Sequence, residues 1–434
     1  MSPFIRYLSA VRSSPICKEE TVQLRPILVF AALSSIFCFS MFYRVTNAVI
    51  APDLMRDLHL NAESLGTLSS AFFYSFALCQ IPMGVLLDKI GPRIVITFFS
   101  LIGASGAFIF GSADSFASAF TGRTLLGIGM ASVLMGSLKV FVIQFPAGRF
   151  AILSGTIISI GTLGNVLATS PLAYLNATIG WRQTLFYAGG INVVLAILLF
   201  WVLKGDVRNR QHGDAALSAQ DKKTGIMESF RLVVSNLSFW QLGAVAFFRY
   251  GTFVALQGLW LGPYFMDIKG LTQMKTGNLL MMLSIGMIIG SPIAGYLTDR
   301  VFYSRKTVIL TGLGLYALCL VPLTGIFDIN SPLVFSVLLF FMGIFSSFGM
   351  LAYTHIKDLF PLNMSGTAMA GVNFFVISGG AVLMQVIGII VEAFVRADRS
   401  YPPQAYHTAF FICLLGMVCG LLFYAFSKDS RRPH

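Results

Sequence analysis

Charged side chains are scarce in this sequence, which has 434 residues and only 11% Asp, Glu, Lys and Arg. An average soluble domain carries about 25% charged residues, so the composition excludes an ordinary soluble protein. Hydrophobic residues instead make up 56% of the chain, and the mean hydropathy is +0.79. Both values are typical of an integral membrane protein.

Histidine and cysteine are also few, at five and six residues. The cysteines form no CxxC pair and mostly fall within hydrophobic runs, which argues against a disulfide framework and against a zinc site. The histidines are scattered, and none stands beside a group of acids, so the sequence offers no catalytic constellation for a membrane-embedded enzyme. We therefore expect a protein without enzymatic activity, bound metal or cofactor.

Acidic residues are fewer than basic ones, 18 against 30, and the formal net charge is +12. A basic protein can bind nucleic acid, but the positions of these charges favour another explanation. With the amino terminus in the cytoplasm, 20 of the Lys and Arg residues fall in cytoplasmic segments and 6 in external loops. This positive-inside distribution predicts a multi-pass protein of the cell (inner or plasma) membrane, embedded in the lipid bilayer. Both termini would be cytoplasmic, with no nucleic-acid partner.

Long hydrophobic runs are abundant, and each is about 20 residues, enough to cross a hydrocarbon core of roughly 30 Å. The sequence predicts twelve spans, at 26–51, 64–87, 93–112, 116–142, 150–174, 183–203, 237–262, 275–298, 307–326, 332–354, 365–391 and 405–427. The expected organisation is a tail, a six-helix bundle, a cytoplasmic linker, a second six-helix bundle and a second tail, at 1–25, 26–203, 204–236, 237–427 and 428–434.

The two halves of the chain resemble each other. The stretch "GVLLDKIGPR" at 84–93 follows the second span, and "GYLTDRVFYSRK" at 295–306 follows the eighth. Similarly, "FYR" at 42–44 in span one pairs with "FFR" at 247–249 in span seven. We interpret one half as a diverged copy of the other, an arrangement known from many transporters.

These motifs, together with "GRTLLGIGMA" in span four, resemble the major facilitator superfamily over residues 25–428. The resemblance implies an all-α integral membrane fold with twelve transmembrane helices in two pseudo-symmetric six-helix bundles. It also implies a cytoplasmic conformational latch made of Gly84, Asp88, Lys89, Gly91 and Arg93, with Asp299 and Arg300 as a partial counterpart. The matching motif of span four consists of Arg123, Gly127 and Gly129. The alternative roles are orientation of the helices for the basic latch residues, and snorkelling for Arg123.

Four basic residues lie within the predicted spans: Arg44, Arg123, Lys139 and Arg249. An arginine near the bilayer centre costs about 2.5 to 3.5 kcal/mol on insertion scales, so each needs a reason. Arg44 and Arg249 occupy equivalent places in the two halves, and no acidic residue falls in the middle of a span. An anionic ligand would compensate both charges, and a planar guanidinium suits a carboxylate or a phosphate.

The residues around Arg44 are similar to those of the organophosphate:phosphate exchangers of this superfamily, in which spans one and seven each supply an arginine to the phosphate site. Tyr43, Arg44, Ala48 and Pro52 follow the span-one pattern of these exchangers. Anion transporters that take organic acids also carry a span-one arginine, so the resemblance does not choose between phosphate and carboxylate. Further substrate-binding candidates are Tyr43, Asn47, Lys139, Gln257, Trp260 and Asn373. The alternatives are hydrogen bonding between helices for the amides and snorkelling for the lysine.

We predict a secondary active transporter that moves a small anionic metabolite, bearing a carboxylate or a phosphate, by alternating access, and we expect a monomer. Uptake of an anion against a negative interior costs roughly 2.3 kcal/mol per charge per 100 mV. Transport therefore needs exchange, or a coupled proton, sodium ion or counter-anion. The alternative prediction is an exporter of drugs, peptides or siderophore-like compounds in which the arginines are structural.

Overall fold

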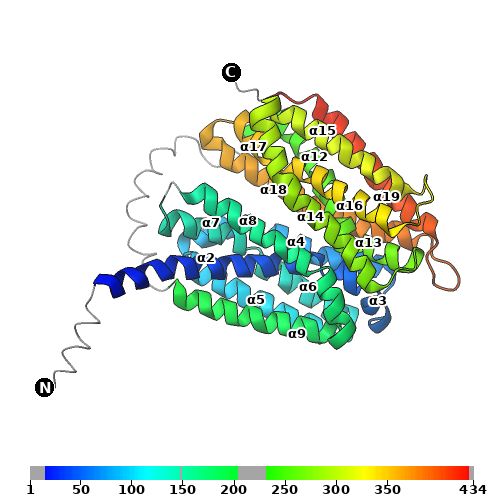
Figure 1. The fold of residues 1–434 in the computed structure, drawn as a ribbon, viewed down its shortest axis with the longest axis horizontal. Coiled ribbons are helices and arrows are strands. Elements are labelled where there is room, and N and C mark those ends of the chain that lie inside the picture. The colour runs from blue at the N-terminus through cyan, green and yellow to red at the C-terminus, as the bar shows by residue number, and fades with distance from the viewer. Residues whose placement is uncertain (1–14, 147–148, 204–230, 430–434) are drawn as a thin grey trace.

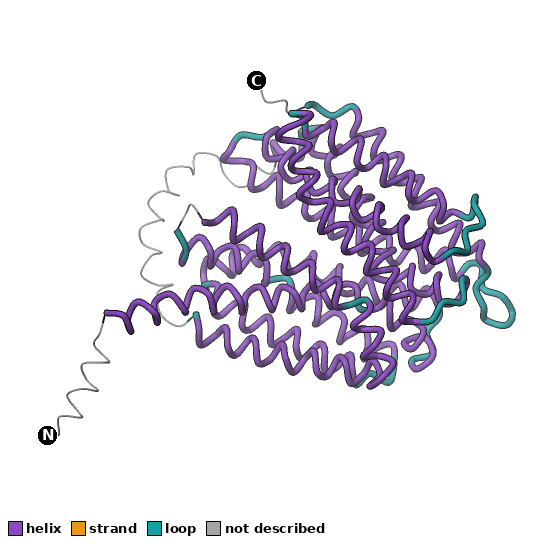
Figure 2. The backbone as a smooth tube through the Cα atoms, viewed as in Figure 1, coloured by secondary structure: helices purple, strands orange, loops and turns teal. Residues whose placement is uncertain are grey.

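All regular elements of the computed structural model are helices, within the residues that it describes: 15–146, 149–203 and 231–429. Figure 2 shows these helices joined by short connections. The predicted linker and both predicted tails lie largely outside the described residues. Helix α2 begins at Pro15, inside the predicted amino-terminal tail, so the first helix starts well before its apolar part.

The amino-terminal half contains α2 (Pro15–Val45), α3 (Asn47–Asp57), α4 (Ala62–Lys89), α5 (Pro92–Gly111), α6 (Phe116–Met130), α7 (Val133–Gln144), α8 (Phe150–Leu167) and α9 (Ser170–Val202). The side chains of Asn61 and Ser115 cap α4 and α6 by accepting a hydrogen bond from the third backbone N–H of each helix. Such caps satisfy amides that have no partner inside the helix.

The carboxyl-terminal half contains α12 (Leu237–Ala255), the π-helix η2 (Leu256–Trp260), α13 (Leu261–Pro263), the π-helix η3 (Tyr264–Ile268), α14 (Gln273–Tyr296), η4 (Leu297–Phe302), α15 (Arg305–Leu320), η5 (Val321–Thr324), α16 (Pro332–Ser347), η6 (Phe348–Met350), α17 (Leu351–Leu359), α18 (Leu362–Glu392) and α19 (Pro403–Ala425). The seventh span runs from Leu237 to Ile268 through α12, η2, α13 and η3, so it extends beyond its expected end at 262. A π-turn inserts a residue into the helix and changes which side chains share a face.

Ten helical segments of the described residues are long and apolar enough to cross a membrane, and a bent pair, Ala62–Gln80 with Pro82–Lys89, makes an eleventh. The shorter apolar helix Ile152–Leu167 lies where the fifth span is expected. Helices thus occupy all twelve predicted positions. Span five is interrupted at 168–169, between α8 and α9, and α9 contains a second break at Gly180, where φ is +80 and ψ is 161. The chain is thus helical at 174, the predicted end of span five, and the break at Gly180 lies between the predicted spans five and six.

Several spans are interrupted, among them spans one, four, five and ten, and the interruptions of spans one and ten bear on the candidate site. Span one breaks at Thr46, between α2 and α3, where the Thr46 hydroxyl donates to the Phe42 carbonyl at 2.7 Å. A threonine hydroxyl that donates to the carbonyl four residues earlier competes with the backbone hydrogen bonds of the helix and bends it. Span ten passes from α16 into α17 through the 3-10 turn η6. Both breaks lie beside the arginines described below.

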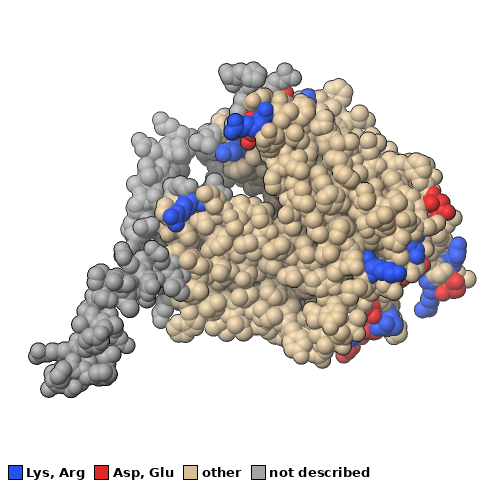
Figure 3. All heavy atoms as spheres, in the orientation of Figure 1, with Lys and Arg blue, Asp and Glu red and all other residues tan. Residues whose placement is uncertain are grey.

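Figure 1 shows two groups of helices, α2–α9 and α12–α19, that lie side by side. The main packing pairs are α5 with α6 and α9 in the first group, and α12 with α18 and α14 with α16 in the second. The groups meet where α4 packs on α18, α14 packs on α8 and α9, and α3 packs on η2 and α13. Figure 3 shows an uncharged band around the middle, with charged side chains gathered toward the two ends.

The two halves touch at one end of the bundle and separate at the other. At the end that carries α3 and α13, called here the distal end, a Cβ on Gly66 would meet the Met384 carbonyl at 3.0 Å. A Cβ on Gly262 would collide with the Ala48 carbonyl. Small residues of this kind allow membrane helices to approach closely.

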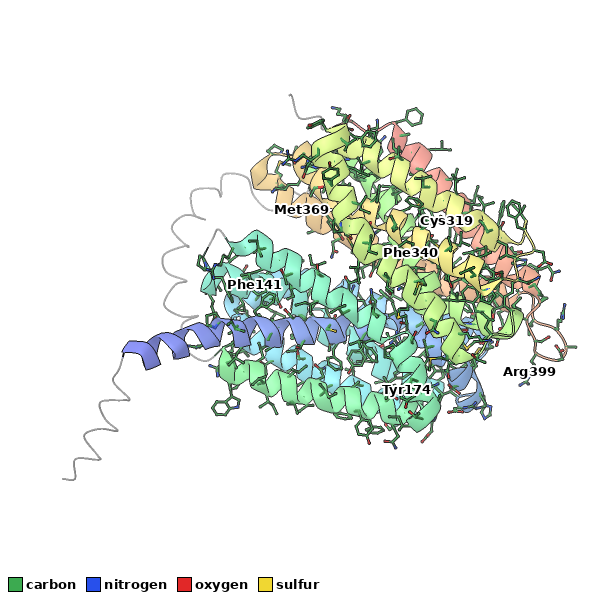
Figure 4. The ribbon with its side chains drawn as sticks, in the orientation of Figure 1. Phe141, Tyr174, Cys319, Phe340, Met369 and Arg399 are labelled. Atoms are coloured by element: carbon green, nitrogen blue, oxygen red, sulfur yellow. The ribbon has the colours of Figure 1, made fainter. Side chains whose placement is uncertain are left out.

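The opposite end, where α9 ends and α12 begins, is called here the linker end. Four glycines near this end, on α4, α8, α14 and α18, would meet no atom within 4 Å of an added Cβ: Gly84, Gly155, Gly295 and Gly366. The ribbons of the two halves diverge toward this end in Figure 1, and the surface is hollowed between them in Figure 3. In Figure 4, Phe141 and Met369 lie toward the linker end of opposite halves, whereas Tyr174 and Arg399 lie at the distal end. The structure is therefore open toward the linker end.

Candidate functional site

Arg44 lies one residue before the end of α2, directly before the break in span one. Its side chain is 7% exposed, and its guanidinium stacks over the Phe76 ring at 4.5 Å from the ring centroid. Nη1 donates to the Tyr250 hydroxyl of the other half at 3.2 Å, and the buried Nε has no hydrogen-bond partner. No ion pair of the described residues involves Arg44, so its charge is compensated only by neutral groups.

Arg249 on α12 is 3% exposed and is held differently. Its Nε donates to the Ser346 carbonyl at 2.7 Å, where span ten leaves its α-helical path, while the buried Nη2 has no partner. Gly349 lies against this side chain, and a Cβ there would meet the Arg249 Nε at 2.7 Å. One guanidinium nitrogen thus stabilises a carbonyl at the break, and another remains available to an acceptor.

Tyrosines surround the two arginines. Tyr353 of α17 lies close enough to both Arg44 and Arg249 for each charge to act on its hydroxyl, and Tyr250 belongs to the same cluster. The Tyr353 hydroxyl donates to the Asn373 side-chain oxygen at 2.9 Å, which joins α17 to α18. The structure therefore brings Arg44, Arg249 and Asn373 into one central cluster together with two tyrosines.

Arg123 lies in the core of the amino-terminal half, and its buried Nε and Nη2 have no hydrogen-bond partner. It is 1% exposed, donates from Nη1 to the Tyr43 carbonyl at 2.8 Å, and has the Phe72 and Phe110 rings over its guanidinium. The Tyr43 carbonyl lies just before the break in span one, so Arg123 supports that break as Arg249 supports the one in span ten. The Tyr43 side chain is fully buried and its hydroxyl has no partner.

The remaining substrate-binding candidates have partners within the protein. Asn47 donates to the Ser69 hydroxyl at 2.8 Å, and Gln257 donates to the Ser284 hydroxyl at 2.6 Å. The two bonds occupy equivalent places, each joining the first span of a half to the second. Trp260 donates to the Met384 carbonyl at 2.9 Å and is 1% exposed, within the closed distal interface.

Lys139 lies at the linker end rather than beside the arginines. Its Nζ donates to the Leu87 carbonyl at 2.7 Å and pairs with Asp88 at 2.5 Å. This pairing ties α7 to the end of α4, where the predicted latch begins.

The other latch residues lie at the same end. Gly91 has φ +93, a left-handed conformation that favours glycine, and it precedes α5. Arg93 donates to the Phe200 carbonyl at 3.0 Å and stacks on its ring. Asp88 is 76% exposed, and Lys89, Asp299 and Arg300 are also exposed. The span-four glycines pack tightly: a Cβ on Gly127 would collide with Phe72, and one on Gly129 with Gly103.

Two carboxylates, Glu392 and Asp53, join the halves at the distal end. Glu392, the last residue of α18, accepts hydrogen bonds from the Ala62 N–H at 2.9 Å and the Tyr401 hydroxyl at 2.8 Å. Burial, followed by the bond to Glu392, raises the pKa of Tyr401 to about 12, so this hydroxyl remains a donor. Asp53 accepts from Asn176 at 2.6 Å and lies 3.4 Å from the amide of Gln273 in the other half.

Asp57, beyond the end of span one, forms a second distal cluster within the amino-terminal half. Trp181 and Arg182 donate to its carboxylate at 3.0 and 2.8 Å, and Arg56 donates at 2.9 Å. Burial alone would raise the pKa of Asp57, but these three hydrogen bonds outweigh it and hold the pKa below its usual range. Among the described residues, no group of three or more His, Cys, Asp or Glu side chains could hold a metal ion.

Comparison with known proteins identifies relatives over almost the whole chain. A family model described as Major Facilitator Superfamily matches residues 32–303 and 261–434. The D-galactonate transporter of Escherichia coli O6:H1 is 23% identical over 85% of this chain and 89% of the relative. The probable sulfoacetate transporter of Cupriavidus necator is 24% identical over 73% of this chain and 76% of the relative. The crystal structure of a bacterial homolog of the human lysosomal transporter Spinster, inward-facing and unoccupied, matches with a TM-score of 0.73, 18% identity and coverage of 92% and 96%.

Proposed function

This chain belongs to the Major Facilitator Superfamily, and from that premise we propose that it carries a small carboxylate-bearing anion through the centre of the bundle. It is a secondary transporter rather than an enzyme. The observation that carries the proposed cargo is the central cluster, in which two buried arginines have neutral partners and free guanidinium nitrogens. A buried cation without a counter-charge is expensive, and a carboxylate from the cargo would supply that charge.

The relatives support a carboxylate over a phosphate. The names of the two curated relatives describe transporters of D-galactonate and of sulfoacetate, both of which carry a carboxylate. In our proposal the carboxylate binds Arg44 and Arg249, because a guanidinium can donate two parallel hydrogen bonds to it. The Tyr353–Asn373 pair lies beside this place and offers neutral polar groups to the rest of the cargo.

The cargo would reach this site from the linker end in the conformation described here. We propose that the linker end faces the cytoplasm, in agreement with the positive-inside distribution of the charges. Alternating access then requires the distal contacts around Gly66, Gly262 and Glu392 to open while the linker end closes. In that second state Asp88 would exchange its bond to Lys139 for contacts across the linker end.

Many transporters couple transport to a proton that binds a carboxylate in the middle of the membrane. This chain has no acidic residue in the middle of a predicted span, so its transport has to be coupled in another way. The carboxylates that join the halves, Glu392 and Asp53, lie at the distal end, which is closed in this conformation. Both carboxylates accept hydrogen bonds within that closed interface, and neither forms a hydrogen bond or ion pair with Arg44 or Arg249 in the part of the chain that the structure describes. We therefore propose that the carrier works by anion exchange, or by symport in which the cargo itself brings the cation.

Uptake into proteoliposomes tests this function. Vesicles containing the purified protein would be assayed with radiolabelled D-galactonate, D-glucarate and sulfoacetate, with and without unlabelled anion inside. We expect saturable uptake of at least one of these anions, and a loss of about tenfold or more in Arg44→Lys. Arg396→Lys, on the exposed loop before α19, is the matched control and should transport normally. Uptake of only neutral or cationic compounds, with Arg44→Lys fully active, would contradict the proposed cargo.

A further inference from the structure

The hydrogen bond between Arg44 and Tyr250 has a feature that the proposed cargo site does not by itself explain. It joins span one to span seven across the two halves, and its acceptor is a side-chain hydroxyl of the protein. Arg44 forms no ion pair, its Nε lacks an acceptor, and the Phe76 ring covers one face of its guanidinium. Among the described residues, the Tyr250 oxygen is therefore the side-chain acceptor that Arg44 has in this conformation.

A tyrosine hydroxyl is a suitable but weak acceptor for a buried guanidinium. It reduces the penalty of leaving the N–H group unpaired, yet it carries no charge. A hydrogen bond from a guanidinium to a carboxylate is roughly twice as strong as one between neutral groups. A carboxylate that reaches Arg44 can thus replace the hydroxyl, whereas a neutral alcohol or amide gains little by doing so.

We propose that Tyr250 competes with the cargo for Arg44: its hydroxyl accepts a hydrogen bond from Arg44 in this conformation and is displaced when the carboxylate binds. This inference rests on the proposed function. It makes Tyr250 a specificity-determining residue, because every ligand of Arg44 has to compete with the hydroxyl. Its effect is to weaken binding of all ligands while excluding those that are poorer acceptors than a carboxylate.

The proposal predicts that removing the Tyr250 hydroxyl raises the affinity for the anion. In Tyr250→Phe the aromatic ring remains but the competing acceptor is lost, so the carboxylate no longer displaces anything. We expect the dissociation constant for the anion to fall about threefold to tenfold, in line with the loss of one competing hydrogen bond. Discrimination against the corresponding neutral amide should also become weaker. If Tyr250 instead only supported the site or bound the cargo, the same variant would bind less tightly.

Equilibrium binding of D-galactonate, D-glucarate and sulfoacetate to the purified protein, measured by calorimetry, tests this inference. The control is Tyr353→Phe, which removes a neighbouring hydroxyl that bonds to Asn373 rather than to an arginine, and which should give no gain in affinity. The melting temperature of each variant checks that it is folded. If the dissociation constant for the anion is unchanged or higher in Tyr250→Phe while wild-type binding still depends on Arg44, the proposed role of Tyr250 is wrong. The proposed function would not be affected by that result. Absence of binding to the wild-type protein for all three anions would overturn the proposed function and this inference together.

Discussion

Glu392 provides the sharpest test of how the two conformations are balanced. Its carboxylate accepts from the Ala62 N–H and from the Tyr401 hydroxyl, and that hydroxyl also accepts from the Ala62 N–H at 2.9 Å. These bonds join the end of α18 to the first residue of α4, so they can exist only while the distal end is closed. We expect Glu392→Ala to favour the state in which the distal end is open.

The size of the shift follows from the number and burial of these bonds. A hydrogen bond to a charged group contributes about 1.5 to 3 kcal/mol when buried, and less where water can replace the partner. The cluster is only partly buried, so we assign about 2 kcal/mol to the bonds of Glu392 together. This corresponds to a roughly 30-fold change in the equilibrium between the two states.

A cysteine introduced at Met384 measures this equilibrium, because Met384 is fully buried in the distal interface and becomes accessible only when that interface opens. In a background without native cysteines, its rate of reaction with a hydrophilic maleimide should rise about 30-fold in Glu392→Ala. Asp398→Ala is the control, because Asp398 accepts from Ser400 of its own loop. An unchanged rate in Glu392→Ala, or an equal rise in the control, would refute this reasoning.

Three further predictions concern other parts of the chain. Asp57→Asn should lower the free energy of unfolding by about 1 kcal/mol at pH 7. The pKa of Asp57 is lower in the folded than in the unfolded protein, so its contribution to stability is present above the unfolded pKa and is lost as the pH falls through the folded pKa. The melting curves of the variant and the wild type should therefore converge in acid. Gly262→Leu should disfavour the closed distal end through collision with the Ala48 carbonyl, and Met384→Cys labelling should then be fast without any change at Glu392. Lys139→Met should release Asp88 and speed proteolytic cleavage near residues 88–91; an unchanged cleavage rate would contradict the importance of this pair.

The sequence predicts most of the fold because hydrophobic length is a local property. Each span needs about 20 apolar residues whatever its neighbours are, so composition alone locates it. The break at Thr46 and the start of α9 at Ser170 depend on single hydrogen bonds and on a proline in a first turn. Such details are not visible in hydropathy, so the sequence does not predict the interruptions within spans one and five.

The candidate site could be predicted from the sequence where the charge of a residue was enough to single it out. Arg44 and Arg249 stand out because a guanidinium at that depth is costly, and their closeness within one cluster follows from the internal repeat. Counting helical positions from Arg249 was less informative for Gln257, because the π-turn η2 changes the register of the face. In the structure Gln257 bonds to Ser284.

Tyr353 and Tyr250 required three-dimensional information. Tyr353 belongs to a helix that begins after the break in span ten, and nothing in its local sequence indicates that both arginines lie nearby. Tyr250 directly follows Arg249, and helical geometry places adjacent residues about 100° apart, so the sequence makes Tyr250 only a weak candidate for the same site. The bond to Arg44 from the other half is formed only by the packing of span one on span seven.

The central claim, that Arg44 binds the carboxylate of the cargo, is tested most directly by equilibrium binding to three proteins: wild type, Arg44→Lys and Arg44→Gln. The account predicts that D-galactonate, D-glucarate or sulfoacetate binds the wild type. It predicts at least tenfold weaker binding to Arg44→Lys, which keeps the charge without the planar fork, and a larger loss in Arg44→Gln. Equal affinities of the three folded proteins for an anion that the wild type binds would contradict it.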